Sequence, residues 1–137
     1  MKIASSFLVN ALLTIVGAVL LFQIAPSQAS AGSLDNAALA CYVDTFAYDQ
    51  LVSDYCWSPW TPSTGNRSTT AHFEITGLPP GNYSYRWSRK TCGAGTECSV
   101  SIRVNQTIYD VAVKIQNLNS GETTSVFAVA EYPDGWN

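Results

Sequence analysis

The sequence predicts an all-β fold, arranged as one small sandwich or barrel of about six to seven short antiparallel strands. Apolar and polar residues alternate with a period of two along much of the chain after residue 31, and turn residues separate the alternating runs. The same part has no apolar stripe with helical spacing. All four cysteines also lie there, which is typical of small exported domains.

The N-terminal residues have the pattern of a secretory signal peptide. Lys2 gives a short basic start, an apolar run occupies 7–24, and small residues dominate 25–31. The apolar run is nearly long enough to cross a bilayer. Its polar interruptions and the small-residue tail favour cleavage over a retained membrane anchor.

Cleavage after Ala29 and cleavage after Ala31 both fit this pattern. We therefore expect a signal peptide at 1–31 and a single mature domain at 32–137. The expected location is secreted or periplasmic, with no stable membrane insertion after the signal peptide is removed.

The predicted mature part has about 106 residues, a normal size for one domain and too small for two. Without Lys2 it contains six Lys and Arg residues against ten Asp and Glu, a net charge of about −4. An acidic surface repels a phosphate backbone, so nucleic acid is not expected as a partner. There is also no polybasic segment to attract anionic lipid.

The first half of the mature sequence contains three predicted strands. The run 39–48 forms the first and 54–57 a short second one, and two prolines and a glycine make 58–66 a loop. The run 70–76 alternates cleanly, so we expect one face to be apolar and the other polar. The apolar face carries Ala71, Phe73 and Ile75, and the polar face carries His72, Glu74 and Thr76.

The second half contains four more. A Pro-Pro-Gly turn at 77–81 leads into a strand at 82–88, and a loop at 89–96 leads into a strand at 97–104. The runs 107–116 and 124–132 form a hairpin around a polar, glycine-containing turn. The residues expected to share apolar faces are Tyr83, Tyr85 and Trp87, then Val100, Ile102 and Val104.

Several of these strands resemble strands B, C, F and G of an immunoglobulin-like or PKD-like domain. The matching segments are Phe73-x-Ile75, the run 83–87, Val111-x-Val113 and Val126-x-Ala128. The resemblance covers about 70–132. It implies an immunoglobulin-like β-sandwich in which Trp87, at the position of the strand C tryptophan, is buried in the core.

The chain departs from true immunoglobulin domains because no cysteine falls in the strands that match B and F. Their inter-sheet disulfide is therefore not expected, and neither is a receptor or antibody role. The segment 77–83 also resembles the turn into strand F of fibronectin type III modules. Three further strands follow it, which favours the first alignment, and both alignments give a sandwich.

The cysteine count predicts two disulfides in an oxidising compartment. Four cysteines allow three pairings, and the local one, Cys41–Cys56 with Cys92–Cys98, is preferred. A zinc site is the alternative, but the spacings are not of the C-x2-C kind and His72 is the only histidine. We expect no metal and no cofactor.

Catalysis is not predicted. A Ser-His-Asp arrangement would have to use His72, in the middle of a strand, and no G-x-S-x-G elbow occurs. Asp44, Asp49 and Asp54 are spaced as solvated surface groups more than as paired glycosidase carboxylates. They also lack the D-x-D-x-D spacing of a calcium loop. The chain is therefore expected not to be an enzyme.

Tryptophans in loops or at strand ends are the strongest candidates for ligand contact. Trp57 and Trp60 lie beside Ser, Thr and Asn residues, and flat aromatic rings in a polar setting suit the apolar faces of sugars. The competing interpretation is that a small domain uses these rings to fill its core. Joint exposure of Trp57 and Trp60 would favour the sugar hypothesis, with carbohydrate or an envelope polymer as the ligand.

Two other roles remain open at this point. One is an accessory protein that binds another secreted or envelope protein through a sheet edge, for which an exposed 124–130 strand would be the sign. The other is a protease inhibitor that acts through a rigid loop. The segment Arg89-Lys90-Thr91-Cys92 is the candidate, because a basic residue lies beside a disulfide there.

Overall fold

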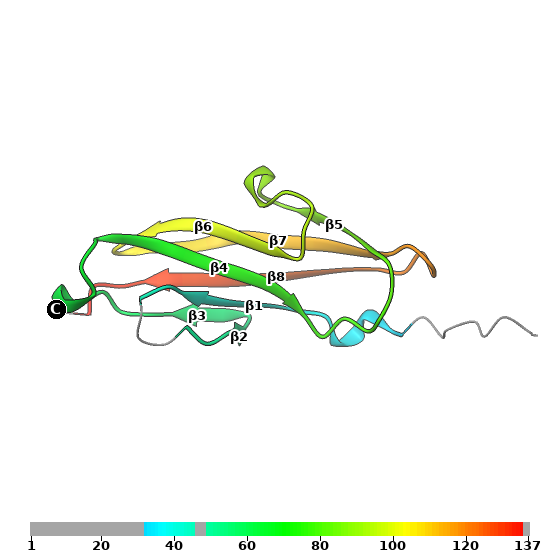
Figure 1. The fold of residues 1–137 in the computed structure, drawn as a ribbon, viewed down its shortest axis with the longest axis horizontal. Coiled ribbons are helices and arrows are strands. Elements are labelled where there is room, and N and C mark those ends of the chain that lie inside the picture. The colour runs from blue at the N-terminus through cyan, green and yellow to red at the C-terminus, as the bar shows by residue number, and fades with distance from the viewer. Residues whose placement is uncertain (1–31, 46–48, 136–137) are drawn as a thin grey trace, which may run out of the picture.

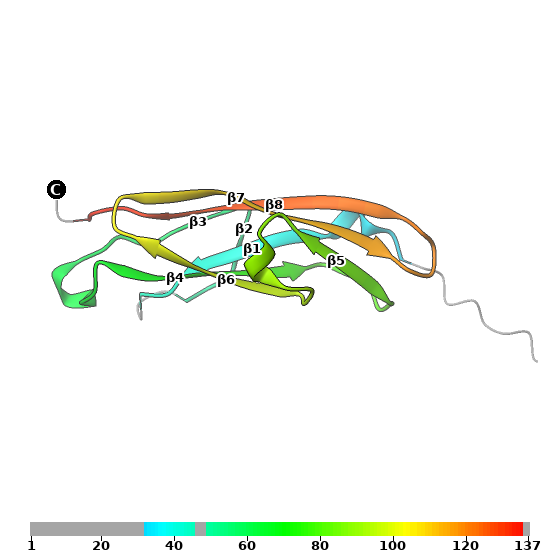
Figure 2. The same ribbon diagram turned by 90° about the horizontal axis from the view of Figure 1, so that it is seen from above.

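The computed structural model describes residues 32–45 and 49–135, which form two four-stranded sheets packed face to face (Figure 1, Figure 2). The predicted signal peptide at 1–31 lies outside the described residues. The all-β fold is confirmed. The described part has eight strands instead of six to seven, because the chain between residues 38 and 57 forms three separate strands.

The strands and the three short 3-10 turns follow one another in a simple order. They are η1 (Leu34–Asn36), β1 (Ala38–Val43), β2 (Val52–Ser53), β3 (Tyr55–Trp57), η2 (Pro62–Thr64), β4 (Ser68–Thr76), β5 (Tyr83–Trp87), η3 (Lys90–Cys92), β6 (Glu97–Arg103), β7 (Gln106–Asn117) and β8 (Thr123–Tyr132).

Sheet A has the strand order β2-β1-β4-β6, and sheet B has the order β3-β8-β7-β5. All pairs are antiparallel except β3 with β8, which is parallel. This corrects the expectation of a purely antiparallel sandwich. The parallel pair arises because the chain leaves sheet A after β2 and joins sheet B with β3, beside the last strand (Figure 1).

Two predicted strands differ in position from those observed. The first ends at Val43, and its predicted end at 46–48 lies outside the described residues. Only the end of the run 124–130 is covered by a second strand, because β3 pairs with Val129 and Ala130 whereas the residues before them pair with β7 alone. By strand order the outermost strands are β2 and β6 in sheet A, and β3 and β5 in sheet B.

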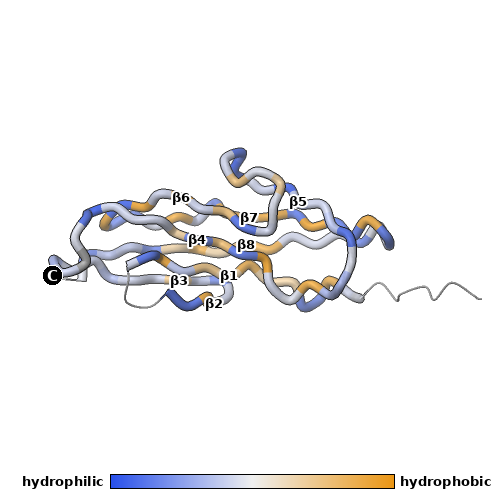
Figure 3. Tube along the Cα trace, viewed as in Figure 1, coloured by the Kyte–Doolittle hydropathy of each residue, from blue (hydrophilic) through white to orange (hydrophobic). Residues whose placement is uncertain are grey.

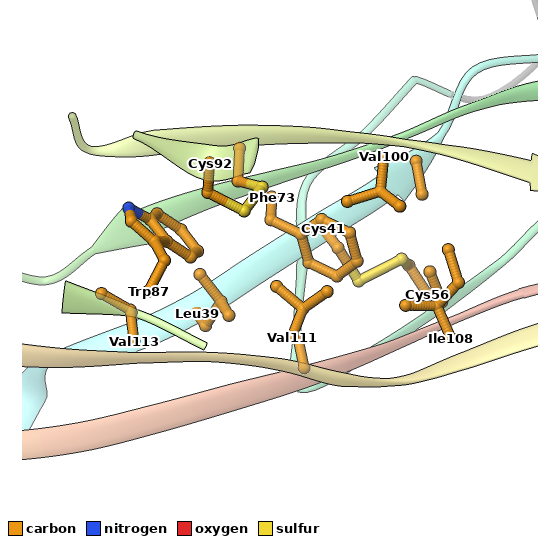
Figure 4. Packing of buried hydrophobic residues seen from close by; sticks show 14 of the residues in the cluster. Leu39, Cys41, Cys56, Phe73, Trp87, Cys92, Val100, Ile108, Val111 and Val113 are labelled. Carbon is orange, nitrogen blue, oxygen red and sulfur yellow. A yellow bond between two sulfur atoms is a disulfide. The ribbon is translucent and has the colours of Figure 1, made fainter. Parts of the chain in front are cut away.

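The core lies between the sheets and is built from the predicted inward positions. Side chains from β1, β4 and β6 face those of β7, with Phe73 and Cys41 near the middle (Figure 4). Trp87 is 7 % exposed, as the immunoglobulin resemblance implied for that position. Its Nε1 donates a 2.9 Å hydrogen bond to the carbonyl of Gly95. Along the long strands the tube alternates between apolar and polar residues (Figure 3), the period expected for half-buried strands.

The predicted disulfide pairing is confirmed: Cys41 bonds Cys56, and Cys92 bonds Cys98. Cys41 lies on β1 of sheet A and Cys56 on β3 of sheet B, so this bond links the two sheets (Figure 4). An inter-sheet disulfide is thus present after all, between strands other than those matching B and F. Two disulfides are typical of proteins from oxidising compartments.

Candidate functional site

The Cys41–Cys56 disulfide determines which side chains of β3 face outward. Cys56 is buried because it must reach Cys41 across the core. Successive side chains of a strand point to opposite faces. Tyr55 and Trp57 therefore lie on the outer face of sheet B, where they are 45 % and 59 % exposed.

The same alternation exposes an aromatic ring on β8. Ala128 and Ala130 are fully buried, so Phe127 and Val129 lie on the outer face, and Phe127 is 62 % exposed. The parallel pairing of β3 with β8 places Tyr55 beside Val129. Ala112 is the residue of β7 opposite Phe127, and its methyl group is too small to cover the ring.

A β-bulge in β7 adds the fourth ring. Ile108 pairs with Ala130 and Val111 pairs with Ala128, so two residues of β7, Tyr109 and Asp110, oppose a single residue of β8. Both are exposed, and Tyr109 is the most exposed large apolar side chain of the described part, at 72 %.

These side chains form one surface, which we call the outer aromatic face. It consists of Tyr55, Trp57, Tyr109, Phe127 and the smaller Val129. Contiguous exposed apolar surface on a small domain usually marks an interaction site.

Polar groups lie among the rings. The Tyr55 hydroxyl donates a hydrogen bond to the Glu131 carboxylate. This bond, together with partial burial, raises the pKa of Tyr55 above its ordinary value. Glu131 is also the β8 residue opposite Trp57, and Thr107 is opposite Glu131 on β7. The Thr107 hydroxyl and the Glu131 carboxylate therefore lie near the rings of Tyr55 and Trp57.

A groove borders the outer aromatic face on the β3 side. It has a volume of about 390 Å³ and lies between β1, β2 and β3. Tyr55 and Trp57 contribute to its wall, so both rings can contact a ligand on the sheet face and at the sheet edge. The other lining residues are Tyr42, Val43, Gln50, Val52 and Cys56.

The two predicted ligand-binding tryptophans have different surroundings. Trp57 belongs to the outer aromatic face. Trp60 is half-buried and packs against the core. The Arg67 guanidinium lies 4.7 Å from the centre of its ring, and its Nε1 donates a 3.3 Å hydrogen bond to the Gly65 carbonyl. Because Arg67 already covers the Trp60 ring, only Trp57 presents an open face, and the two tryptophans are not exposed together.

The outer face of sheet A has a different chemistry. Tyr42 stacks on His72 with ring centroids 4.7 Å apart, and the Ser99 hydroxyl lies 2.9 Å from His72 Nδ1. Glu74 and Glu97 are direct cross-strand neighbours. Burial, followed by nearby carboxylates that include Asp49, raises the pKa of Tyr42. This face is therefore acidic.

The Ser99–His72 pair resembles part of a hydrolytic triad. In a triad the second ring nitrogen is held by a carboxylate, but His72 Nε2 has no hydrogen-bonding partner among the described residues. Stacking on Tyr42 and the contact with the Ser99 hydroxyl are enough to explain the orientation of the His72 ring on the flat sheet surface.

The loop considered for protease inhibition contains the turn η3. Arg89 forms an ion pair with Asp110 of the β7 bulge, its Nε lying 3.1 Å from Oδ1. Lys90 is exposed but begins the 3-10 turn that ends at Cys92. Its backbone is therefore not the extended segment that a strand-like docking mode would require.

Residues 32–45 and 49–135 contain no group of three or more His, Cys, Asp or Glu side chains arranged to hold a metal ion. No helix in that part has the length and apolarity that a membrane crossing requires.

The chain was also compared with known proteins. It matches no protein-family model, no curated protein and no solved structure.

Proposed function

We propose that this protein is an exported, non-catalytic binding domain that holds carbohydrate on the outer aromatic face. The observation that carries the proposal is the gathering of four exposed rings, Tyr55, Trp57, Tyr109 and Phe127, on one sheet surface. Monomeric proteins of this size rarely leave such rings exposed together unless a ligand covers them.

Sugar chains suit this surface for two reasons. The C–H groups on one side of a pyranose ring form a flat apolar face that carries partial positive charge, and the face of an aromatic ring carries partial negative charge. Sugar hydroxyls need hydrogen-bonding partners at the margin, and Glu131, Thr107 and the tyrosine hydroxyls supply them.

An immunoglobulin-like assignment is part of the proposal. The order β1-β4-β6 in one sheet and β5-β7-β8 in the other agrees with A-B-E and C-F-G of immunoglobulin domains. On this assignment β3 is a second half of strand A that has moved to the opposite sheet. Export by a cleaved signal peptide at 1–31 is supported by its sequence pattern and by the two disulfides.

A second candidate function is binding of a protein partner through a sheet edge. The edge strand β6 (Glu97–Arg103) favours it, because β6 pairs only with β4. Its outward positions are polar, with Ser99 and Ser101 in the middle. An added partner strand would extend sheet A and would leave the outer aromatic face of sheet B uncovered.

The proposal is tested by titrating the mature domain with a panel of soluble polysaccharides while following tryptophan fluorescence and heat. We expect saturable binding that Trp57→Ala and Phe127→Ala each weaken by about tenfold or more, because each removes a stacking ring. Leu118→Ala is the matched control, since Leu118 is equally exposed but lies in the β7–β8 turn. Affinity unchanged in the Trp57 and Phe127 variants would overturn the proposal, and so would the absence of binding across the panel.

A further inference from the structure

Two cations face each other at one end of the outer face of sheet B. Arg86 on β5 is the direct cross-strand neighbour of Lys114 on β7, and both side chains are exposed. Like charges in this position repel each other and destabilise the strand pair. Within the described residues neither cation has an ion-pair partner, so the folded protein leaves this repulsion uncompensated.

The pair lies in a hollow that contains neutral hydrogen-bonding groups. The hollow has a volume of about 220 Å³ and is lined by Ser84, Tyr85, Arg86, Lys114 and Gln116. Ser84 and Gln116 are themselves cross-strand neighbours, one step along the strands from the two cations. The Ser84 hydroxyl, the Gln116 amide and the two cations together provide several hydrogen-bond donors for one anionic group.

The register of sheet B places the hollow next to the outer aromatic face. Lys114 is opposite Ser125 on β8, and Phe127 is the next outward residue of that strand. From Ser125 to Glu131, which is opposite Trp57, the strand advances six residues, or about 20 Å. The cations, Phe127, the two tyrosines and Trp57 thus follow one another along the strands on one side of the molecule.

The net acidity of the protein does not cancel this local positive charge. Glu74 and Glu97 lie on the outer face of sheet A, on the far side of a sandwich whose layers are about 10 Å apart. That separation exceeds the screening length of about 8 Å at physiological salt. On sheet B, Asp110 is already paired with Arg89, and Glu131 lies six residues, or about 20 Å, along β8 from the residue opposite Lys114.

We infer that the ligand of the outer aromatic face is an acidic polysaccharide, whose carboxylate or sulfate groups lie between Arg86 and Lys114 while its sugar rings stack on Phe127 and Trp57. This inference rests on the proposed carbohydrate function and specifies its ligand class. The bound anion relieves the repulsion between the two cations, which gives the ligand a charge-assisted contact that a neutral polymer lacks.

The test uses pairs of polymers that differ only in charge, with the mature domain and isothermal titration. Polygalacturonate is compared with its full methyl ester, and dextran sulfate with dextran, so that the two arms distinguish carboxylate from sulfate. We expect the charged member of at least one pair to bind about tenfold more tightly, and added NaCl to reduce the difference.

The informative variant is Lys114→Glu, which places a carboxylate opposite Arg86. It is expected to abolish the preference for the charged polymer while leaving the thermal midpoint equal or higher, because an opposite-charge pair replaces a repulsive one. A thermal midpoint at or above that of the wild type would show that the variant is folded and that misfolding does not cause a loss of binding. The matched control is Arg103→Glu, which changes the net charge equally but lies on the outer face of sheet A.

The possible results distinguish this inference from the carbohydrate proposal on which it rests. If Lys114→Glu and Arg103→Glu weaken acidic polymers equally, only net charge matters and the inference is wrong. Equal affinity of the wild-type domain for both members of each pair would overturn it as well. In either case the carbohydrate function stands if Trp57→Ala still weakens binding, and it fails if Trp57→Ala has no effect.

Discussion

Tyr55 on β3 and Tyr109 on β7 lie on either side of Val129, although they come from different halves of the chain. Two strand spacings separate their backbones by about 10 Å. The small side chain between them leaves an open strip along β8. The Tyr55 hydroxyl is held at one edge of the strip by Glu131, whereas Tyr109 is held by the bulge alone.

The Glu131 contact predicts a change in the titration of Tyr55. The carboxylate accepts a hydrogen bond from the Tyr55 hydroxyl and raises the pKa of Tyr55 above 10.0. Glu131→Gln is expected to lower that pKa toward its ordinary value, as measured from the ring carbon resonances by NMR. Tyr85 is the internal control, because burial raises its pKa and Glu131 is not involved.

The sign of the accompanying stability effect follows from the raised pKa. Stabilisation by the Tyr55–Glu131 bond is fully present below the unfolded pKa of about 10 and is lost as the pH rises through the folded pKa. The wild type and Glu131→Gln should therefore approach equal stability only in strongly alkaline solution. A difference that persists there unchanged would contradict the assignment.

A comparison of two phenylalanines tests the division between core and surface. Phe73 is 1 % exposed in the centre of the sandwich, whereas Phe127 belongs to the outer aromatic face. We expect Phe73→Ala to lower the free energy of unfolding by about 3–5 kcal/mol. Phe127→Ala should change it by no more than about 0.5 kcal/mol. Urea denaturation measures both, and a large loss in the Phe127 variant would place that ring in the core instead.

The two disulfides are expected to contribute unequally. In the chain-entropy description, the Cys41–Cys56 bond, with a sequence separation of 15, contributes about 3 kcal/mol, and Cys92–Cys98, with a separation of 6, about 2 kcal/mol. The double variants Cys41→Ala/Cys56→Ala and Cys92→Ala/Cys98→Ala allow this comparison by thermal unfolding. The first should also weaken glycan binding, because the inter-sheet bond orients Tyr55 and Trp57; the second should not.

The acidic face of sheet A predicts a stabilising substitution. Glu74 and Glu97 are direct cross-strand neighbours, and like charges there are unfavourable by a few tenths of a kcal/mol. Glu97→Lys should raise the free energy of unfolding by about 0.2–1 kcal/mol, and Glu97→Gln by less. The gain should shrink in 1 M salt; a gain independent of salt would point to a cause other than charge.

The Arg89–Asp110 ion pair predicts an acid-dependent effect. The hydrogen bonds that Asp110 accepts from Arg89 lower the pKa of Asp110. The stabilisation by the ion pair is therefore present above the unfolded-state pKa of Asp110 and is lost as the pH falls through its folded-state pKa. Because both side chains are partly solvated, Asp110→Asn should cost about 1 kcal/mol or less at pH 7. The cost should disappear near pH 2, which chemical denaturation across this range would measure.

Much of the fold could be predicted because inward positions repeat every second residue. The inward residues Ala71, Phe73 and Ile75, the burial of Trp87 and the pairing of the cysteines were all correctly predicted. The same alternation also indicated that Phe127 faces outward, because this large apolar residue lies directly before the inward Ala128 on the strand. Trp57 was selected as a candidate for ligand contact because of its polar surroundings, and its exposure follows from its outward position on β3.

The remaining features required the tertiary structure. The bulge breaks the period of two at Tyr109, so no alternation pattern assigns that ring to the outer face. Trp60 and Trp57 are three residues apart, yet Trp60 packs against the core beneath Arg67 whereas Trp57 is exposed on β3.

By itself the sequence determined which residues are buried, because burial follows a local period along each strand. Only the tertiary structure decided which exposed residues share a surface, because strand order and register join distant segments. The parallel pairing of β3 with β8 brings Tyr55 beside Val129, and the pairing of β5 with β7 sets Arg86 against Lys114. Neither pairing can be inferred from spacing along the chain.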